Sequence, residues 1–109
     1  MNKFDSKTEK KFSLLLNKAN IRWINQYRLG RKKYDFFLID YKIIIEVDGD
    51  YWHSNSKTEH FIDAHFKKKI IKNDALKNII AEQAGFKLIR IWESDIDTMS
   101  VEKLKNLLK

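Results

Sequence analysis

The amino-acid sequence predicts an α/β fold in which helices flank a mixed sheet. Three consecutive segments rich in aromatic and β-branched residues occupy the first half of the chain, close enough together to pair as hairpins. A long helical segment then leads to a fourth such segment, and a strand that returns through a helix joins its sheet in parallel. The expected order of elements is therefore αβββαβα.

The first expected element is a helix over residues 6–20. Ser6 and Glu9 have the spacing of a capping box, in which each side chain bonds a backbone amide of the first turn. The apolar residues that follow at helical spacing are Phe12, Leu15, Leu16 and Ala19. The capping box by itself would explain why Glu9 is present.

Three strands are expected next, over residues 21–28, 34–39 and 42–48. A basic turn over residues 29–33 separates the first two strands. Asp40 and Tyr41 separate the second from the third and predict a tight hairpin turn. Residues 49–59 are polar and predict a loop.

The second half of the chain predicts a helix over residues 61–84, a strand over 86–92 and a last helix over 98–108. Gly85 is a suitable C-terminal cap for the long helix. The expected apolar face of that helix consists of Ile62, Phe66, Ile70, Ile80 and Ala84.

Composition narrows the class of protein. The 109 residues suit one domain, residues 1–109, and 43% hydrophobic residues suit a packed core. Without cysteine there is no disulfide framework and no zinc site built on thiolates. No apolar run has the length of a membrane span, and the polar start lacks the apolar core of a signal peptide. We therefore expect a cytoplasmic protein that does not bind membranes.

The net charge of +7 is unevenly distributed along the chain. Residues 1–33 carry ten basic residues against two acidic ones, whereas residues 34–109 carry twelve against thirteen. A basic segment of this kind favours a polyanionic partner such as DNA, because Lys and Arg release counterions from phosphates. A solvated lysine-rich surface would give the same composition. The basic residues placed best to bind a DNA backbone are Arg28, Arg31, Lys32 and Lys33.

Three acidic residues are expected to meet on the sheet. Side chains alternate faces along a strand, so Glu46 and Asp48 share one face, opposite to the isoleucines around them. A two-residue turn at 40–41, or a four-residue loop over 39–42, places Asp35 directly opposite Glu46, whereas a three-residue loop would not. Like charges placed so close are destabilising without a cation or shared protons. Oxygen ligands of this kind favour Mg²⁺ or Mn²⁺, which can activate water and neutralise a phosphoryl group.

At these residues the chain resembles the P-D-(D/E)-x-K nuclease superfamily, and within it the very short patch repair endonucleases and related homing endonucleases of the E-D-x-H-D type. The pattern is matched in order by Glu9, Asp35, the run from Ile45 to His53, and Asp74, and the chain also has the Trp92-Glu93 pair that ends the closing strand. The resemblance covers residues 8–96. It implies a restriction-endonuclease-like αβββαβ core in a protein of a prokaryotic or phage-infected cell.

The chain departs from the family pattern at several positions. Tyr34 replaces the usual proline, and Asp48 stands where the superfamily has its lysine. From this sequence we expect neither the structural zinc site of the repair enzymes nor the DNA-reading domain of the longer homing enzymes. Mismatch or long-site specificity is therefore not implied, and a homodimer or a partner protein could supply specificity.

The expected function is a Mg²⁺- or Mn²⁺-dependent DNA endonuclease. Asp35, Asp48 and Glu46 would bind the metal ion, and His53 would transfer a proton or position the phosphate. Glu9 and Asp74 would support the site, although Asp74 could also be a solvated helix acid. The alternatives are an inactive nucleic-acid-binding module of the same fold, an RNA-directed nuclease, or a structural protein whose acids lie on the surface.

Overall fold

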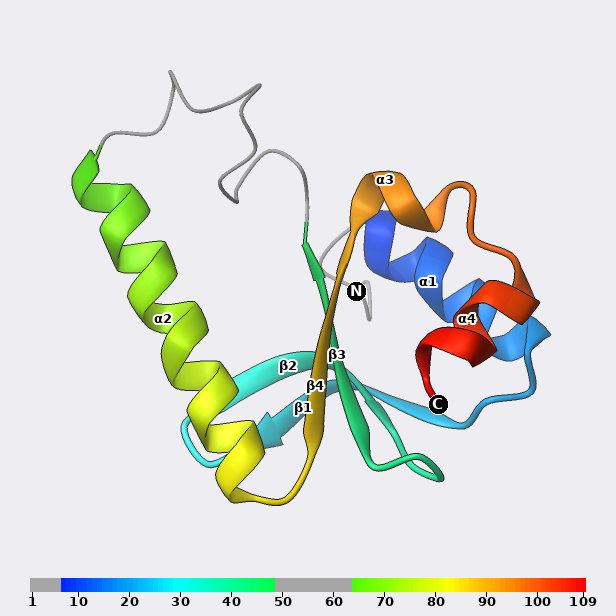
Figure 1. The fold of residues 1–109 in the computed structure, drawn as a ribbon, viewed down its shortest axis with the longest axis horizontal. Coiled ribbons are helices and arrows are strands. Elements are labelled where there is room, and N and C mark those ends of the chain that lie inside the picture. Colours follow the sequence, from blue (N-terminus) through cyan, green and yellow to red (C-terminus); the bar gives the residue numbers. More distant parts are fainter. Residues whose placement is uncertain (1–6, 49–63) are drawn as a thin grey trace.

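The computed structural model describes residues 7–48 and 64–109 (Figure 1). Its centre is a four-stranded sheet in the order β1-β2-β3-β4. The first three strands are antiparallel neighbours, whereas β4 lies parallel to β3. The predicted mixed sheet is therefore confirmed, and its strands are β1 Trp23–Leu29, β2 Lys32–Leu38, β3 Ile43–Asp48 and β4 Lys87–Trp92.

Helices cover both faces of the sheet (Figure 1). Helix α2, Ala64–Gln83, lies on one face, and three helices lie on the other: α1 Lys7–Lys18, α3 Glu93–Ile96 and α4 Val101–Leu107. Helix α3 was not predicted. It has four residues and begins directly where β4 ends, so it is too short to show a helical period.

The larger core lies between the sheet and α1, α3 and α4. Phe36 is fully buried there, and its ring meets the rings of Phe12 and Trp23 edge to face at centroid distances of 5.4 Å. Leu16 and Ala19 are also buried, which confirms the apolar face predicted for α1. A smaller cluster of Tyr34, Ile44 and Ala81 lies between the sheet and α2.

The face predicted for α2 is confirmed only in part by the residues that the structure describes, because Ile80 is half-buried as expected but Ala84 is exposed. Ala81 is fully buried although it was outside the predicted stripe. Ile71, Leu76 and Ile79 are exposed, which shows that this helix has apolar residues on more than one side. The hydrophobic pattern alone therefore could not identify the buried side.

The β1–β2 turn is shorter than predicted. Leu29 belongs to β1 and pairs with Lys32 of β2, so the turn contains only Gly30 and Arg31. Gly30 has a φ of +62°, a left-handed conformation that glycine adopts without steric cost. The predicted basic turn is therefore mostly strand, and its lysines lie on β2.

The β2–β3 loop has four residues, 39–42, and not two. The backbone amide of Lys42 donates to the carbonyl of Leu38 at 2.9 Å and closes this loop. The strand register is nevertheless the predicted one, because a four-residue loop keeps the same partners, such as Phe36 with Ile45.

The end of α2 confirms Gly85 as its cap, with a φ of +85°. The amide of Phe86 donates to the carbonyl of Ala81 at 3.0 Å across this cap. Within the described ranges no helix is both long enough and apolar enough to cross a membrane.

Candidate active site

Strand β3 presents different side chains to the two layers of helices. Ile43, Ile45 and Val47 pack in the core beneath α1 and α4. Glu46 and Asp48 are buried at 4% and 7% exposure, and both bind side chains on the α2 side of the sheet. The alternation expected from the sequence is confirmed, and it buries two carboxylates together.

Strands β1 and β2 pair regularly except at the position where Gln26 faces Asp35. Gln26 has a φ of +53°, which is costly for a residue with a Cβ atom. Side chains two apart in a regular strand share a face, yet Tyr34 packs beneath α2 and Phe36 packs in the opposite core. The strand therefore rotates at Asp35, as at the β-bulges that redirect side chains near functional sites.

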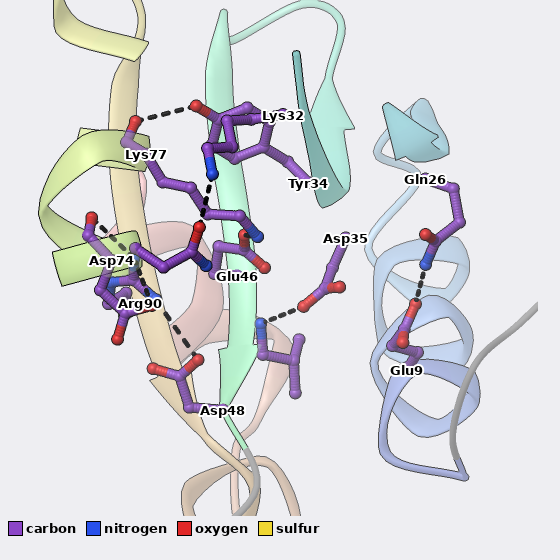
Figure 2. A network of polar contacts seen from close by, with 12 residues as sticks. Glu9, Gln26, Lys32, Tyr34, Asp35, Glu46, Asp48, Asp74, Lys77 and Arg90 are labelled. Atoms are coloured by element: carbon purple, nitrogen blue, oxygen red, sulfur yellow. Dashed lines mark hydrogen bonds and ion pairs between the residues drawn. The ribbon is translucent and has the colours of Figure 1, made fainter. Parts of the chain in front are cut away.

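The Asp35 carboxyl group lies against the middle of β3 (Figure 2). Its Oδ2 atom accepts a hydrogen bond from the backbone amide of Val47 at 2.7 Å. Burial, followed by the charge of Glu46 and a hydrogen bond with it, raises the pKa of Asp35 to about 9, and Glu9 adds to this effect. In the metal-free protein at neutral pH, the Asp35 carboxyl group is therefore protonated.

Glu9 approaches the same region from α1. Its Oε1 atom accepts hydrogen bonds from Gln26 Nε2 at 2.8 Å and from Asn25 Nδ2 at 3.2 Å. The Asn25 amide also donates to the carbonyl of Asp35 at 3.0 Å. Glu9 is thus connected to the backbone of Asp35 through β1, and the capping box proposed with Ser6 lies outside the described residues.

Glu46 is paired with Lys77, which reaches it from α2 (Figure 2). The Lys77 ammonium also lies 5.3 Å from the centre of the Tyr34 ring, and the Tyr34 hydroxyl donates to the Lys77 carbonyl at 2.8 Å. Burial and the charge of Glu46 raise the pKa of Tyr34, so its hydroxyl keeps the proton that it donates. Lys77 is therefore held by both its backbone and its ammonium group.

Asp48 and Asp74 are joined by Arg90 of β4. The two guanidinium NH groups lie 3.5 Å from Asp48 Oδ1 and 3.5 Å from Asp74 Oδ1. Asp74 belongs to α2, and its side chain contacts Arg90 of the neighbouring strand. These distances are longer than those of well-formed charged hydrogen bonds, so the bridge is a loose one.

The three predicted metal ligands do not gather at one point. Asp35 lies beside Glu46, whereas Asp48 is turned to Arg90. Within residues 7–48 and 64–109, no group of three or more Asp, Glu or His side chains is arranged to hold a metal ion. His53 lies outside the described residues.

Sequence reasoning missed three residues of the site: Gln26, Lys77 and Arg90. Asp74, Lys77 and Ala81 have helical spacing that places them on one face of α2, which was an available signal. Arg90 is a charged residue with apolar neighbours on both sides in the interior of β4, which was another available signal. Nothing in the sequence marks Gln26.

The predicted DNA-binding residues lie together at the end of the β1–β2 hairpin. Arg28 pairs with Lys33 across the two strands, and both are exposed, as is Arg31. Lys32 is half-buried, and its ammonium donates to Asn73 of α2. Because Asn73 precedes Asp74 on α2, this contact places the basic end of the hairpin close to Asp74.

The left-handed backbone of Gln26 gives a prediction about stability. Gln26→Gly is expected to be more stable than Gln26→Ala by about 1 kcal/mol, because both lose the amide that binds Glu9 but only alanine keeps the steric cost. Urea unfolding of the two variants measures the difference. At Asn25 the order should reverse, since glycine weakens a regular strand. If Gln26→Gly were less stable than Gln26→Ala, the left-handed backbone at this position would have no steric cost.

Comparisons with known proteins agree with this architecture. No protein-family model matches the sequence, and no curated protein matches it. Among solved structures, the chain is similar to the homing endonuclease I-Bth0305I catalytic domain, with a TM-score of 0.64 and 19% sequence identity. The match covers 95% of this chain and 91% of that domain. The chain therefore has the fold of a nuclease catalytic domain, which fits a restriction-endonuclease-like core.

Proposed function

We propose that this protein is an endonuclease that hydrolyses phosphodiester bonds in DNA with the help of Mg²⁺ or Mn²⁺. The observation that carries the proposal is the contact between the carboxyl groups of Asp35 and Glu46 on neighbouring strands, where Glu46 is 4% exposed and the pKa of Asp35 is raised to about 9. Two carboxyl groups in contact destabilise the folded protein, and such pairs are typical of functional sites. The likeness to a homing endonuclease catalytic domain supports hydrolysis of DNA as that task.

The carboxylates suit a hard divalent cation. Mg²⁺ binds through one or two carboxylates with water completing its coordination, and the two oxygen-rich side chains of Asp35 and Glu46 provide that number. Asp48 would be a third ligand if its carboxylate turned from Arg90, to which it is loosely held. A bound divalent cation would supply an activated water and would neutralise charge on the phosphoryl group.

Other residues of the chain would orient the side chains of this site. The Val47 amide donates to one oxygen of Asp35, and the Asp35 carboxyl group is also hydrogen-bonded with Glu46. Glu9 adds negative charge from the far side of Asp35, and Asp74 orients Arg90 beside Asp48. We propose that His53 moves a proton at the departing oxygen of the phosphate or positions that phosphate.

The exposed side chains of Arg28, Arg31 and Lys33 would bind DNA phosphates beside the site. Replacing all three with alanine is expected to weaken binding about tenfold or more at 0.1 M salt and to lower the slope of log affinity against log salt by about 2 to 3. Fluorescence anisotropy with a labelled duplex at several salt concentrations measures both quantities. The matched control removes three exposed lysines from α1 and α4, namely Lys18, Lys103 and Lys105. Equal losses in the two triple variants would argue against a specific hairpin surface.

Supercoiled plasmid is the substrate that tests the proposal as a whole. Nicking or linearisation is expected with Mg²⁺ or Mn²⁺ and not with EDTA, because the site needs the cation to neutralise phosphate charge. A competing single-stranded or structured RNA should not suppress the reaction. Binding of DNA without cleavage under any of these metal conditions would favour an inactive binding module, and preferred cleavage of RNA would favour an RNA-directed nuclease.

A further inference from the structure

The Lys77 ammonium occupies the side of Glu46 that faces α2 (Figure 2). The Glu46 side chain is 6% exposed and the Lys77 side chain 18% exposed, so this ion pair is largely removed from water. The backbone of Lys77 is held as well, because its carbonyl accepts a hydrogen bond from the Tyr34 hydroxyl at 2.8 Å. A lysine held in this way is a structural part of the site and not a mobile surface charge.

The groups around Lys77 are mostly acidic. Strand β3 contributes Glu46 and Asp48, strand β2 contributes Asp35, and α2 itself contributes Asp74. The other cationic side chains in this network are Arg90 of β4, which is engaged with the two outer aspartates, and Lys32 of β2, which donates to Asn73. Glu46 therefore depends on Lys77 for its neutralisation when no metal ion is bound.

We propose that Lys77 is the resident counter-ion of Glu46 and competes with the divalent cation for that carboxylate. This inference rests on the proposed function, since it assumes that Glu46 is a ligand. An ammonium and a divalent cation repel each other strongly within a few ångströms in a poorly solvated site. Without either one, a buried Glu46 carboxylate would be left uncompensated, which is destabilising. Lys77 thus keeps the metal-free protein folded at the cost of metal affinity.

Only the Lys77 side chain has to move when a cation binds. The hydrogen bond from Tyr34 holds the backbone of α2 in place, whereas the four-carbon stem of lysine can turn its ammonium away from Glu46. Lys77 is therefore a positioning residue that sets how tightly the site binds its metal ion. The direction of the effect separates this role from a purely structural one, because loss of a structural residue would weaken metal binding.

Isothermal titration with Mn²⁺ in the absence of DNA tests the competition. Lys77→Met is expected to bind Mn²⁺ about tenfold more tightly than the wild type, because the competing charge is gone while the stem keeps its length. Lys77→Arg retains the charge and should bind Mn²⁺ within about twofold of the wild type. The matched control is Lys72→Met, which removes an exposed lysine of the same helix that is not paired with Glu46.

Thermal unfolding with and without Mn²⁺ provides a second measurement. Lys77→Met should have a lower melting temperature than the wild type in EDTA and a larger gain on adding Mn²⁺, because the cation replaces the ammonium against Glu46. Unchanged or weaker Mn²⁺ binding in this variant, or a variant that stays unfolded in saturating Mn²⁺, would overturn the inference. If neither protein bound Mn²⁺, the metal dependence of the proposed nuclease would fail as well, which is a distinct result.

Discussion

Asp35→Asn is expected to reduce DNA nicking about 1,000-fold in saturating Mg²⁺ or Mn²⁺. Asparagine keeps the size of the side chain and an oxygen that can accept the Val47 amide hydrogen, but it removes the negative charge that would hold the cation. A loss of this size corresponds to about 4 kcal/mol of transition-state stabilisation, as expected when a central charged group of a catalytic site is removed. The measurement is the initial rate of conversion of supercoiled to nicked plasmid.

The control for this prediction is Asp40→Asn. Asp40 lies in the loop after β2, where its exposed carboxylate pairs with Arg22, so the variant makes the same change of charge on the same hairpin. Its nicking rate should stay within about twofold of the wild type, since exposed ion pairs contribute little. DNA binding by Asp35→Asn should persist, because the exposed hairpin cations are unchanged. A rate in Asp35→Asn above a tenth of the wild-type rate would remove Asp35 from the chemistry.

The same residue governs the second large effect, which is the pH dependence of stability in the metal-free protein. The pKa of Asp35 is raised to about 9 in the folded state, whereas an unfolded aspartate titrates near its ordinary value of about 4. A raised folded pKa gives stability that is complete below about pH 4 and is lost as the pH rises through 9. The free energy of unfolding in EDTA should therefore fall between pH 5 and pH 9.

Asp35→Asn is expected to remove most of this dependence. At pH 8 in EDTA the variant should be more stable than the wild type by about 2 kcal/mol, because it needs no proton to occupy the buried position. Urea unfolding at pH 5, 7 and 9 measures the difference between the two proteins, in which the contributions of other titrating groups cancel. Parallel curves for the two proteins would show that Asp35 is not protonated in the folded state. The variant that loses activity should thus be the more stable protein without metal.

The central strand could be predicted from sequence with little ambiguity. Its alternation of isoleucine and valine with Glu46 and Asp48 fits only one assignment of faces, and the structure confirms that assignment. The register of β2 on β3 also followed from the sequence, because both even loop lengths give the same partners. The alternation of apolar and polar residues was sufficient to predict the face of the sheet on which each β3 side chain lies.

The missed parts depend on contacts that no local pattern encodes. Lys77 and Glu46 are 31 residues apart, and only the final packing of α2 on the sheet brings them together. The rotation of β2 at Asp35 lies opposite the left-handed backbone of Gln26 in the neighbouring strand, and glutamine has no marked preference for that conformation. The expectation that Asp48 joins the other two carboxylates did not include Arg90, which holds it.

The parallel pairing of β3 with β4 has a consequence for the order of folding. Strands β1, β2 and β3 are joined by short turns, so the antiparallel part of the sheet can form from contacts close in sequence. Strand β4 is separated from β3 by the whole of α2, so its pairing and the ion pair from Arg90 to Asp48 close a loop of 42 residues at a larger entropic cost. The acidic face of β3 should therefore acquire its cationic partners Lys77 and Arg90 later than the hairpin contacts form. Divalent cations present during refolding would meet these carboxylates before Lys77 and Arg90 do.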